Sequence, residues 1–72
     1  MDKLLLKSIM TLNGDTIRKL SEEMKITPQT FTAKLNERGG AEFRQSEICF
    51  IKSRYHLTPD EIDRIFFGKK VS

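Results

Sequence analysis

The chain offers few side chains of the kinds that carry out catalytic or metal chemistry. His56 is its one histidine and Cys49 its one cysteine, and neither has a second ligand, a nucleophile or a general base arranged near it in the sequence. A zinc site needs several cysteine or histidine ligands at characteristic spacings. We therefore expect a protein that binds rather than catalyses, with no cofactor and no metal.

Side chains suited to binding gather between Thr27 and Arg38. Amide, hydroxyl and cationic groups follow one another there, among them Gln29, Thr32 and Lys34. On an arbitrary helix such a row is a solvated face with no further role. What these side chains do therefore depends on the elements that position them.

The sequence predicts an all-α chain. Apolar residues recur at helical spacing along most of it, and no segment alternates with period two for long enough to form a strand. We expect five helices, at about 2–12, from about 16 to 24, from 28 to about 38, at about 45–55 and from 59 to about 67. Thr27-Pro28 is typical of an N-cap followed by the first helical residue, and Thr58-Pro59-Asp60-Glu61 is typical of a capping box.

One small core should form where the apolar stripes of these helices meet. We expect its buried side chains to be Leu5, Ile9, Ile17, Leu20, Met24, Phe31, Leu35, Ile48, Ile51 and Ile62. Phe43 should fill the core from the loop before the fourth helix. Phe50 and Phe67 fall off the apolar stripes of their helices, so we expect both to be exposed. Residues 69–72 should form a frayed tail.

Length and composition indicate a single domain. The chain has 72 residues and a formal charge of +3, which suits an anionic partner but is common in ordinary domains. A lone cysteine fits a reducing compartment. No apolar run is long enough to cross a bilayer, and the N-terminal stretch does not have the pattern of a secretory signal. We therefore expect a cytoplasmic protein.

The spacing within residues 17–36 predicts two short helices that cross at a tight turn. Such a crossing needs a small residue in the first helix, and Ser21 occupies that position. The helices also need apolar residues that lock them together. These are Leu20, Met24, Ile26, Phe31 and Leu35.

Several further segments continue this pattern downstream. They are Phe31-Thr32-Ala33-Lys34-Leu35-Asn36, Phe43, Ser46-Glu47-Ile48, Leu57-Thr58-Pro59-Asp60-Glu61-Ile62 and Ile65-Phe66-Phe67. With them, residues 3–67 resemble the small Cro- and repressor-type helix-turn-helix regulators of temperate phages of Gram-positive bacteria. Within that family, the length and the closing segment resemble the lactococcal modulators of repression, which are Cro-like antirepressors. Lys25 departs from the family pattern, because glycine is usual at that turn position, and Arg44 replaces a threonine cap.

The resemblance implies a helix-turn-helix motif at about 16–38 whose third helix enters the major groove of DNA. Carried over by position, the DNA-binding residues would be Thr27, Pro28, Gln29, Thr32, Ala33, Lys34, Asn36 and Arg38. Gln29 would be the base reader, since an amide can pair with adenine through two hydrogen bonds. Thr16 and Arg18, near the start of the second helix, would contact phosphates.

The small charge of this region leaves two mechanisms open. Lys34 and Arg38 are the cations between residues 27 and 40, and Glu37 opposes them, so a monomer should bind DNA weakly. In the first mechanism the protein is a Cro-like regulator that binds double-stranded operator DNA. An alternative version of this mechanism is a dimer that binds the operator alone and makes no contact with the repressor. In the second it is an antirepressor that binds the N-terminal DNA-binding domain of the co-encoded phage repressor.

The antirepressor mechanism needs a surface that a protein can recognise. Candidate contacts are Glu22, Glu23, Glu42, Glu47, Phe50 and Phe67. Acids could meet the basic surface of a repressor, and phenylalanines left over from the core could anchor the contact. Under either mechanism we expect a regulator of the lysis–lysogeny switch that can form a weak homodimer and has no membrane or small-molecule partner.

Overall fold

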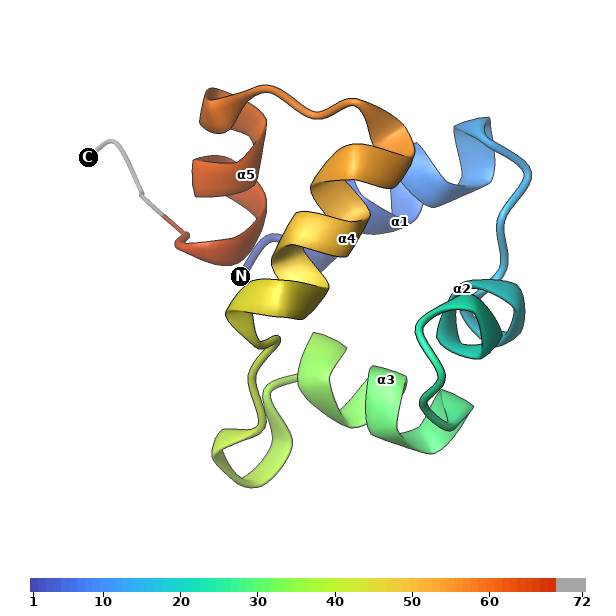
Figure 1. Ribbon diagram of the computed structural model, residues 1–72. Coiled ribbons are helices and arrows are strands. Elements are labelled where there is room, and N and C mark those ends of the chain that lie inside the picture. Colours follow the sequence, from blue (N-terminus) through green and yellow to red (C-terminus); the bar gives the residue numbers. More distant parts are fainter. Residues whose placement is uncertain (69–72) are drawn as a thin grey trace.

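A computed structural model describes residues 1–68 of the chain, and within this range it contains helices and no strand (Figure 1). The elements are α1 (Lys3–Leu12), α2 (Ile17–Glu23), α3 (Pro28–Leu35), the short 3-10 helix η1 (Arg38–Gly40), α4 (Gln45–Tyr55) and α5 (Pro59–Phe66). The prediction of an all-α chain is thereby confirmed for this range. The predicted tail at 69–72 lies outside the described residues.

Side-chain caps explain where most of these helices begin. Thr27 accepts a hydrogen bond from the backbone N–H of Thr30 at 3.1 Å, and Pro28 follows as the first helical residue. The predicted capping box of α5 is present: Thr58 Oγ1 accepts from Glu61 N–H at 3.2 Å, and Glu61 Oε1 accepts from Thr58 N–H at 2.9 Å. These caps satisfy backbone donors that a helix leaves without partners in its first turn.

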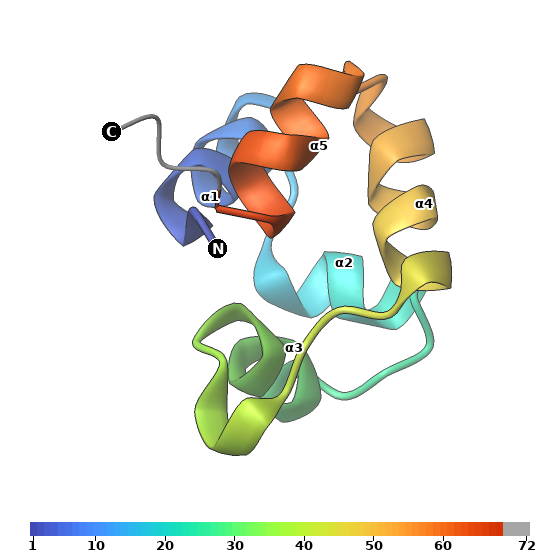
Figure 2. The same cartoon turned by 90° about the vertical axis from the view of Figure 1, so that its left-hand side faces the viewer.

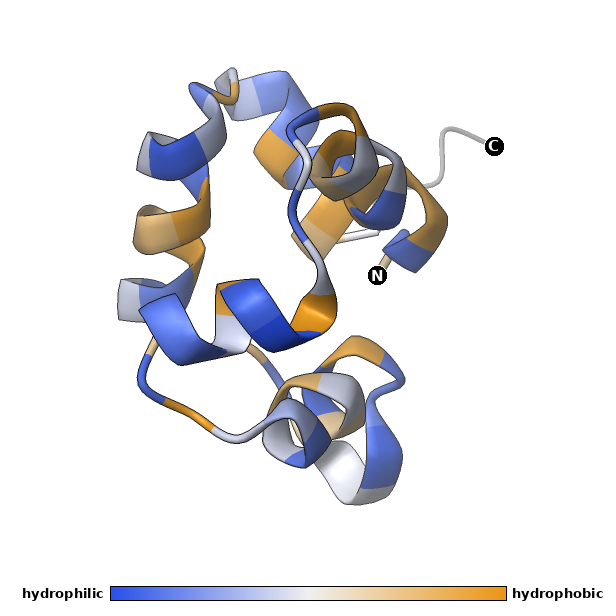
Figure 3. Cartoon of the chain, turned by 90° about the vertical axis from the view of Figure 1, so that its right-hand side faces the viewer, coloured by the Kyte–Doolittle hydropathy of each residue, from blue (hydrophilic) through white to orange (hydrophobic). Residues whose placement is uncertain are grey.

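The helices fall into two groups. In Figures 1 and 2, α1, α4 and α5 form one part of the molecule, and α2 and α3 form the other part below it. The contacts between elements agree, since α5 packs against both α1 and α4 while α2 packs against α3. Figure 3 shows apolar and polar residues interleaved along each helix, as expected for helices with one buried face.

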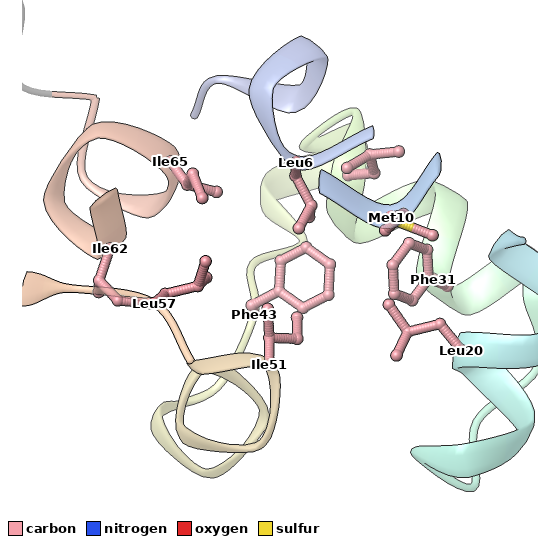
Figure 4. Packing of buried hydrophobic residues seen from close by; sticks show 10 residues of the cluster. Leu6, Met10, Leu20, Phe31, Phe43, Ile51, Leu57, Ile62 and Ile65 are labelled. Carbon is pink, nitrogen blue, oxygen red and sulfur yellow. The ribbon is translucent and has the colours of Figure 1, made fainter. Parts of the chain in front are cut away.

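The core lies where the two groups meet (Figure 4). Its buried apolar residues are Leu6, Met10, Leu20, Phe31, Leu35, Phe43, Ile51, Leu57, Ile62 and Ile65. As predicted, Phe43 fills the core from the segment before α4. Its ring meets the rings of Phe31 and Phe66 edge to face, with centroids 5.3 and 5.6 Å apart, which is a favourable arrangement for aromatic pairs.

The core prediction was wrong about which stripe of α1 is buried. Leu6 and Met10 are buried, whereas Leu5 and Ile9 are half-buried at the edge of the core and Leu12 is 85 % exposed. Both pairs have the same four-residue spacing, so periodicity does not distinguish them. Three other predicted core residues are also half-buried, namely Ile17, Met24 and Ile48.

The end of α3 also differs from the prediction. The helix ends at Leu35 and does not continue to about Arg38. Glu37 adopts a left-handed conformation with φ +53°, and the chain then turns through η1, where Gly39 and Gly40 both have positive φ. Asn36 is therefore the C-cap of α3, and Arg38 lies beyond the helix. Within residues 1–68 no helix is both long enough and apolar enough to span a membrane.

Candidate functional site

The crossing of α2 and α3 is built around a buried serine. Ser21 has no exposed surface, and its hydroxyl donates to the carbonyl of Arg18 at 2.9 Å, so a polar group is buried without losing its hydrogen bond. The small side chain at this position agrees with the predicted close approach of the two helices. A larger side chain would have to push the helices apart.

The turn between these helices requires a left-handed residue. Lys25 has φ +61°, a conformation that costs a non-glycine residue roughly 1 kcal/mol. Hydrogen bonds hold the turn: Lys25 N–H donates to the carbonyl of Glu22 at 3.1 Å, and Ile26 N–H donates to that of Ser21 at 3.0 Å. The chain therefore keeps the tight turn although it lacks the glycine that would ease it.

The outer side of α3 presents neutral polar groups. Thr27, Pro28, Gln29 and Asn36 are exposed, whereas Thr32 and Ala33 are half-buried. Two of these side chains already have partners. Thr27 Oγ1 caps the helix, and Asn36 Oδ1 accepts from Lys3 Nζ at 2.8 Å. Among the described residues, the Gln29 amide makes no hydrogen bond within the chain and is available to a partner. We call these six residues the α3 face.

Lys34 was predicted to be a DNA-binding residue, but the structure places it in an ion pair within the chain. Its ammonium group donates to both carboxylate oxygens of Glu47 at 2.7 Å, and the two side chains are only 13 % and 14 % exposed. Glu47 Oε1 also accepts from the backbone N–H of Arg44 at 2.7 Å, which caps the start of α4. The structure therefore corrects two placements, because neither Lys34 nor Glu47 extends from the surface toward a partner.

This pair is electrostatically well matched. Burial by itself would raise the pKa of the Glu47 carboxyl, but the hydrogen bonds from Arg44 N–H and from Lys34 outweigh that effect, and the pKa of Glu47 lies below its ordinary value. Glu47 is therefore ionised at neutral pH, and it neutralises the one cation of α3. Each candidate contact on α3 itself is thus uncharged or neutralised.

The two predicted phosphate contacts, Thr16 and Arg18, lie at the surface, as does Arg38. Arg18 is exposed, with its Nε 3.8 Å from Glu22 one turn along the same helix. Thr16 is exposed too, but its hydroxyl accepts from the backbone N–H of Lys19 at 3.1 Å as the N-cap of α2. Arg38 is exposed on η1 and has no ion pair within residues 1–68.

The predicted protein contacts differ in how far they are accessible. Glu22, Glu23 and Glu42 are exposed, and Phe67 is 59 % exposed. Phe50 is not fully exposed as predicted, because it is half-buried at the edge of the core. An open groove beside it is lined by residues at the end of α2 and by residues of α4.

Sequence reasoning missed one buried polar cluster. The carboxylate of Asp15, just before α2, accepts from Arg54 Nε at 2.8 Å, from Arg54 Nη2 at 3.1 Å and from the Tyr55 hydroxyl at 2.6 Å. The hydrogen bonds from Arg54 lower the pKa of Asp15 to about 2, although burial opposes them. Burial and the neighbouring Asp15 carboxylate raise the pKa of Tyr55. No local signal in the sequence links Asp15 to residues that lie 39 and 40 positions away.

The Asp15 cluster has the geometry of a structural clamp. Arg54 binds Asp15 through two nitrogens, the strong arrangement for an arginine–carboxylate pair, and its Nη1 lies 3.6 Å from Glu23. These hydrogen bonds join all three side chains into one network. In the described part of the chain, no group of three or more His, Cys, Asp or Glu side chains could hold a metal ion.

Comparison of this chain with protein-family models, with curated proteins and with solved structures finds no match.

Proposed function

We propose that α2 and α3 form a helix-turn-helix motif and that the protein regulates a phage lysis–lysogeny switch by binding the N-terminal DNA-binding domain of the co-encoded repressor. The resemblance of residues 3–67 to phage regulators supports the choice of system. The buried Ser21 and the tight turn at Lys25 support the motif.

The neutralised Lys34 is the observation that favours a protein partner over DNA. Affinity for DNA comes largely from cations that replace the counterions of phosphates. The one cation of α3 is held by both oxygens of Glu47, so the α3 face has no charge of its own to offer a phosphate. The centres of protein–protein contacts are depleted of charged residues.

The exposed acids of this chain indicate that the surface of the protein partner is basic. Glu42 lies exposed in the segment after η1, and Glu22 and Glu23 lie exposed on α2. A repressor domain that binds DNA carries a basic surface, and acidic groups facing that surface would speed association and select the partner. Because Glu47 is committed to Lys34, we assign no partner contact to it.

Calorimetry with the two purified proteins tests this proposal. We expect a direct complex with a dissociation constant in the micromolar range or below, weakened by added salt. Glu42→Lys should weaken it about tenfold, which corresponds to about 1.4 kcal/mol. Asp60→Lys is the matched control, since Asp60 is an exposed acid at the start of α5, at the end of the molecule away from α3 (Figure 1). Absence of a complex at micromolar concentrations would exclude repressor capture.

Operator binding is the second candidate. The exposed Gln29 near the start of α3 favours it, as do Lys25 and Arg38, which lie exposed at either side of the helix without ion pairs in the part of the chain that is described. This mechanism predicts a dimer that shifts operator DNA without the repressor, because two half-sites supply both affinity and specificity. A gel-shift titration over the switch region, with Gln29→Ala as the variant, tests it. Gln29→Ala should relax sequence preference by about 1–3 kcal/mol.

A further inference from the structure

A small pocket opens beside the C-terminal end of α3, between the segment after η1, α4 and α5. Its volume is about 110 Å³, room for several water-sized groups of about 30 Å³ each. Apolar residues make up most of its lining, and they are Met1, Phe43, Ile48, Phe66 and Phe67. Phe43 and Phe66 belong to the aromatic cluster of the core, so this wall is held in place from behind.

The charges around the pocket are unbalanced. Lys34 lines it, but Glu47 takes up its charge. Glu37 also lines it, and its Oε1 accepts from the amino group of Met1 at 2.8 Å. Glu42 is exposed and has no ion pair among residues 1–68. Among residues 1–68, the uncompensated charge at this pocket is therefore negative.

We infer that this pocket receives an arginine side chain from the protein partner. An aliphatic stem would lie against Ile48 and the phenylalanines, and the guanidinium would reach the carboxylate of Glu42. A guanidinium also stacks on aromatic faces, and Phe67, 59 % exposed at the pocket, offers one. An apolar pocket with one acid that has no ion pair among residues 1–68 suits a long side chain that is cationic only at its tip.

The inference rests on the proposed function for the identity of the partner, but not for the chemistry of the pocket. A DNA-binding domain carries arginines on its DNA-facing surface, and one of these, inserted here, would be unavailable to a phosphate or a base. Residues buried in a pocket at the centre of an interface contribute most of its binding energy, and arginine is enriched among them.

The pocket can be tested without the repressor. The whole protein, labelled with ¹⁵N, is titrated with N-acetyl-arginine amide and separately with N-acetyl-citrulline amide, a neutral molecule of nearly the same shape. We expect saturable shifts for the arginine compound at Glu42, Ile48 and Phe67, with a dissociation constant in the millimolar range, and at least fivefold weaker binding of the citrulline compound. Equal binding of both, or shifts that do not saturate at these residues, would overturn the inference.

Variants separate the pocket from the rest of the surface. Glu42→Gln and Phe67→Ala should each weaken binding of the arginine compound severalfold, while Glu22→Gln and Leu12→Ala, at an exposed acid and an exposed leucine outside the pocket, should leave it unchanged. Circular dichroism checks that each variant is folded. Concentration-dependent shifts at the pocket without any ligand would mean that a second copy of the chain occupies it, which would also overturn the inference.

The repressor complex then provides an independent outcome. If the repressor domain binds, Phe67→Ala should weaken the complex about tenfold and Leu12→Ala should not. If no complex forms while the arginine compound binds as expected, the proposed function fails and the pocket stands. If the complex forms but tolerates Glu42→Gln and Phe67→Ala, the proposed function stands and the pocket is wrong.

Discussion

The two ends of α4 are each held by a partly buried charge pair, yet the two pairs have different consequences. At the C-terminal end, Arg54 and Tyr55 hold Asp15 from the loop before α2. At the N-terminal end, Glu47 holds Lys34 from α3. We call them the Asp15 clamp and the Lys34 pair. The Asp15 clamp joins three side chains in one satisfied network, whereas the Lys34 pair joins two side chains and one backbone cap.

The difference lies in what each pair withdraws from the surface. None of the three side chains of the Asp15 clamp is a proposed contact with DNA or with the repressor. The clamp therefore fixes the position of α2 relative to α4 without removing any binding group from the surface. The Lys34 pair uses the one cation of α3 and thereby changes what the α3 face can bind. The number of charges in a segment is therefore a poor guide to the number available to a ligand.

The largest expected effect is the loss of the Asp15 clamp. Asp15→Asn removes the carboxylate that both Arg54 and Tyr55 need, and leaves a partly buried guanidinium without its main partner. We expect the free energy of unfolding to fall by about 2–3 kcal/mol, as measured by urea denaturation at neutral pH. Asp60→Asn, at an exposed acid, should stay within about 0.5 kcal/mol. A similarly small change for Asp15→Asn would show that the clamp contributes nothing to stability.

Acid titration examines the same clamp in the wild-type chain. The pKa of Asp15 is lowered from 3.8 to about 2 in the folded state, so its stabilising effect is present above pH 3.8 and is lost as the pH falls toward 2. The difference corresponds to about 2 kcal/mol. Thermal midpoints measured across this pH range should fall less steeply for Asp15→Asn than for the wild type. Parallel curves would contradict the lowered pKa.

A smaller effect is expected from the Lys34 pair. Glu47→Gln removes the negative charge but keeps an oxygen that can accept from Arg44 N–H, so the start of α4 should remain capped. We expect a loss of about 1 kcal/mol in the free energy of unfolding. A double-mutant cycle with Lys34→Met isolates the coupling between the two side chains. If Glu47→Gln costs as much as Asp15→Asn, the two ends of α4 are equally important for stability.

The smallest effect is the most informative for function. Lys34→Met should leave the salt slope of any weak DNA binding unchanged, because Lys34 is held by Glu47 and makes no phosphate contact. Arg38→Ala should lower the salt slope by about one, and Glu47→Gln should raise it by about one by releasing Lys34. Fluorescence anisotropy over a series of salt concentrations measures these slopes. A slope that falls by about one for Lys34→Met would mean that Lys34 reaches phosphates in spite of Glu47.

The amino-acid sequence alone determined the helical elements and several of their ends. The capping box at Thr58 and the Thr27-Pro28 start are local signals, since each involves residues within one turn of the same helix. The need for a small residue at Ser21 also followed from the spacing of neighbouring apolar residues. These features were predictable because the groups that interact lie close together in the chain.

Only the tertiary structure decided which groups from distant segments meet. Periodicity on α1 allowed either Leu5 and Ile9 or Leu6 and Met10 to face inward, and packing against the rest of the core selected the second pair. The partners of Asp15 lie 39 and 40 positions away, and Glu47 lies 13 positions from Lys34. A charged side chain pairs with whichever opposite charge the fold brings within a few ångströms, and that distance is set by how the helices pack, not by the sequence around either residue.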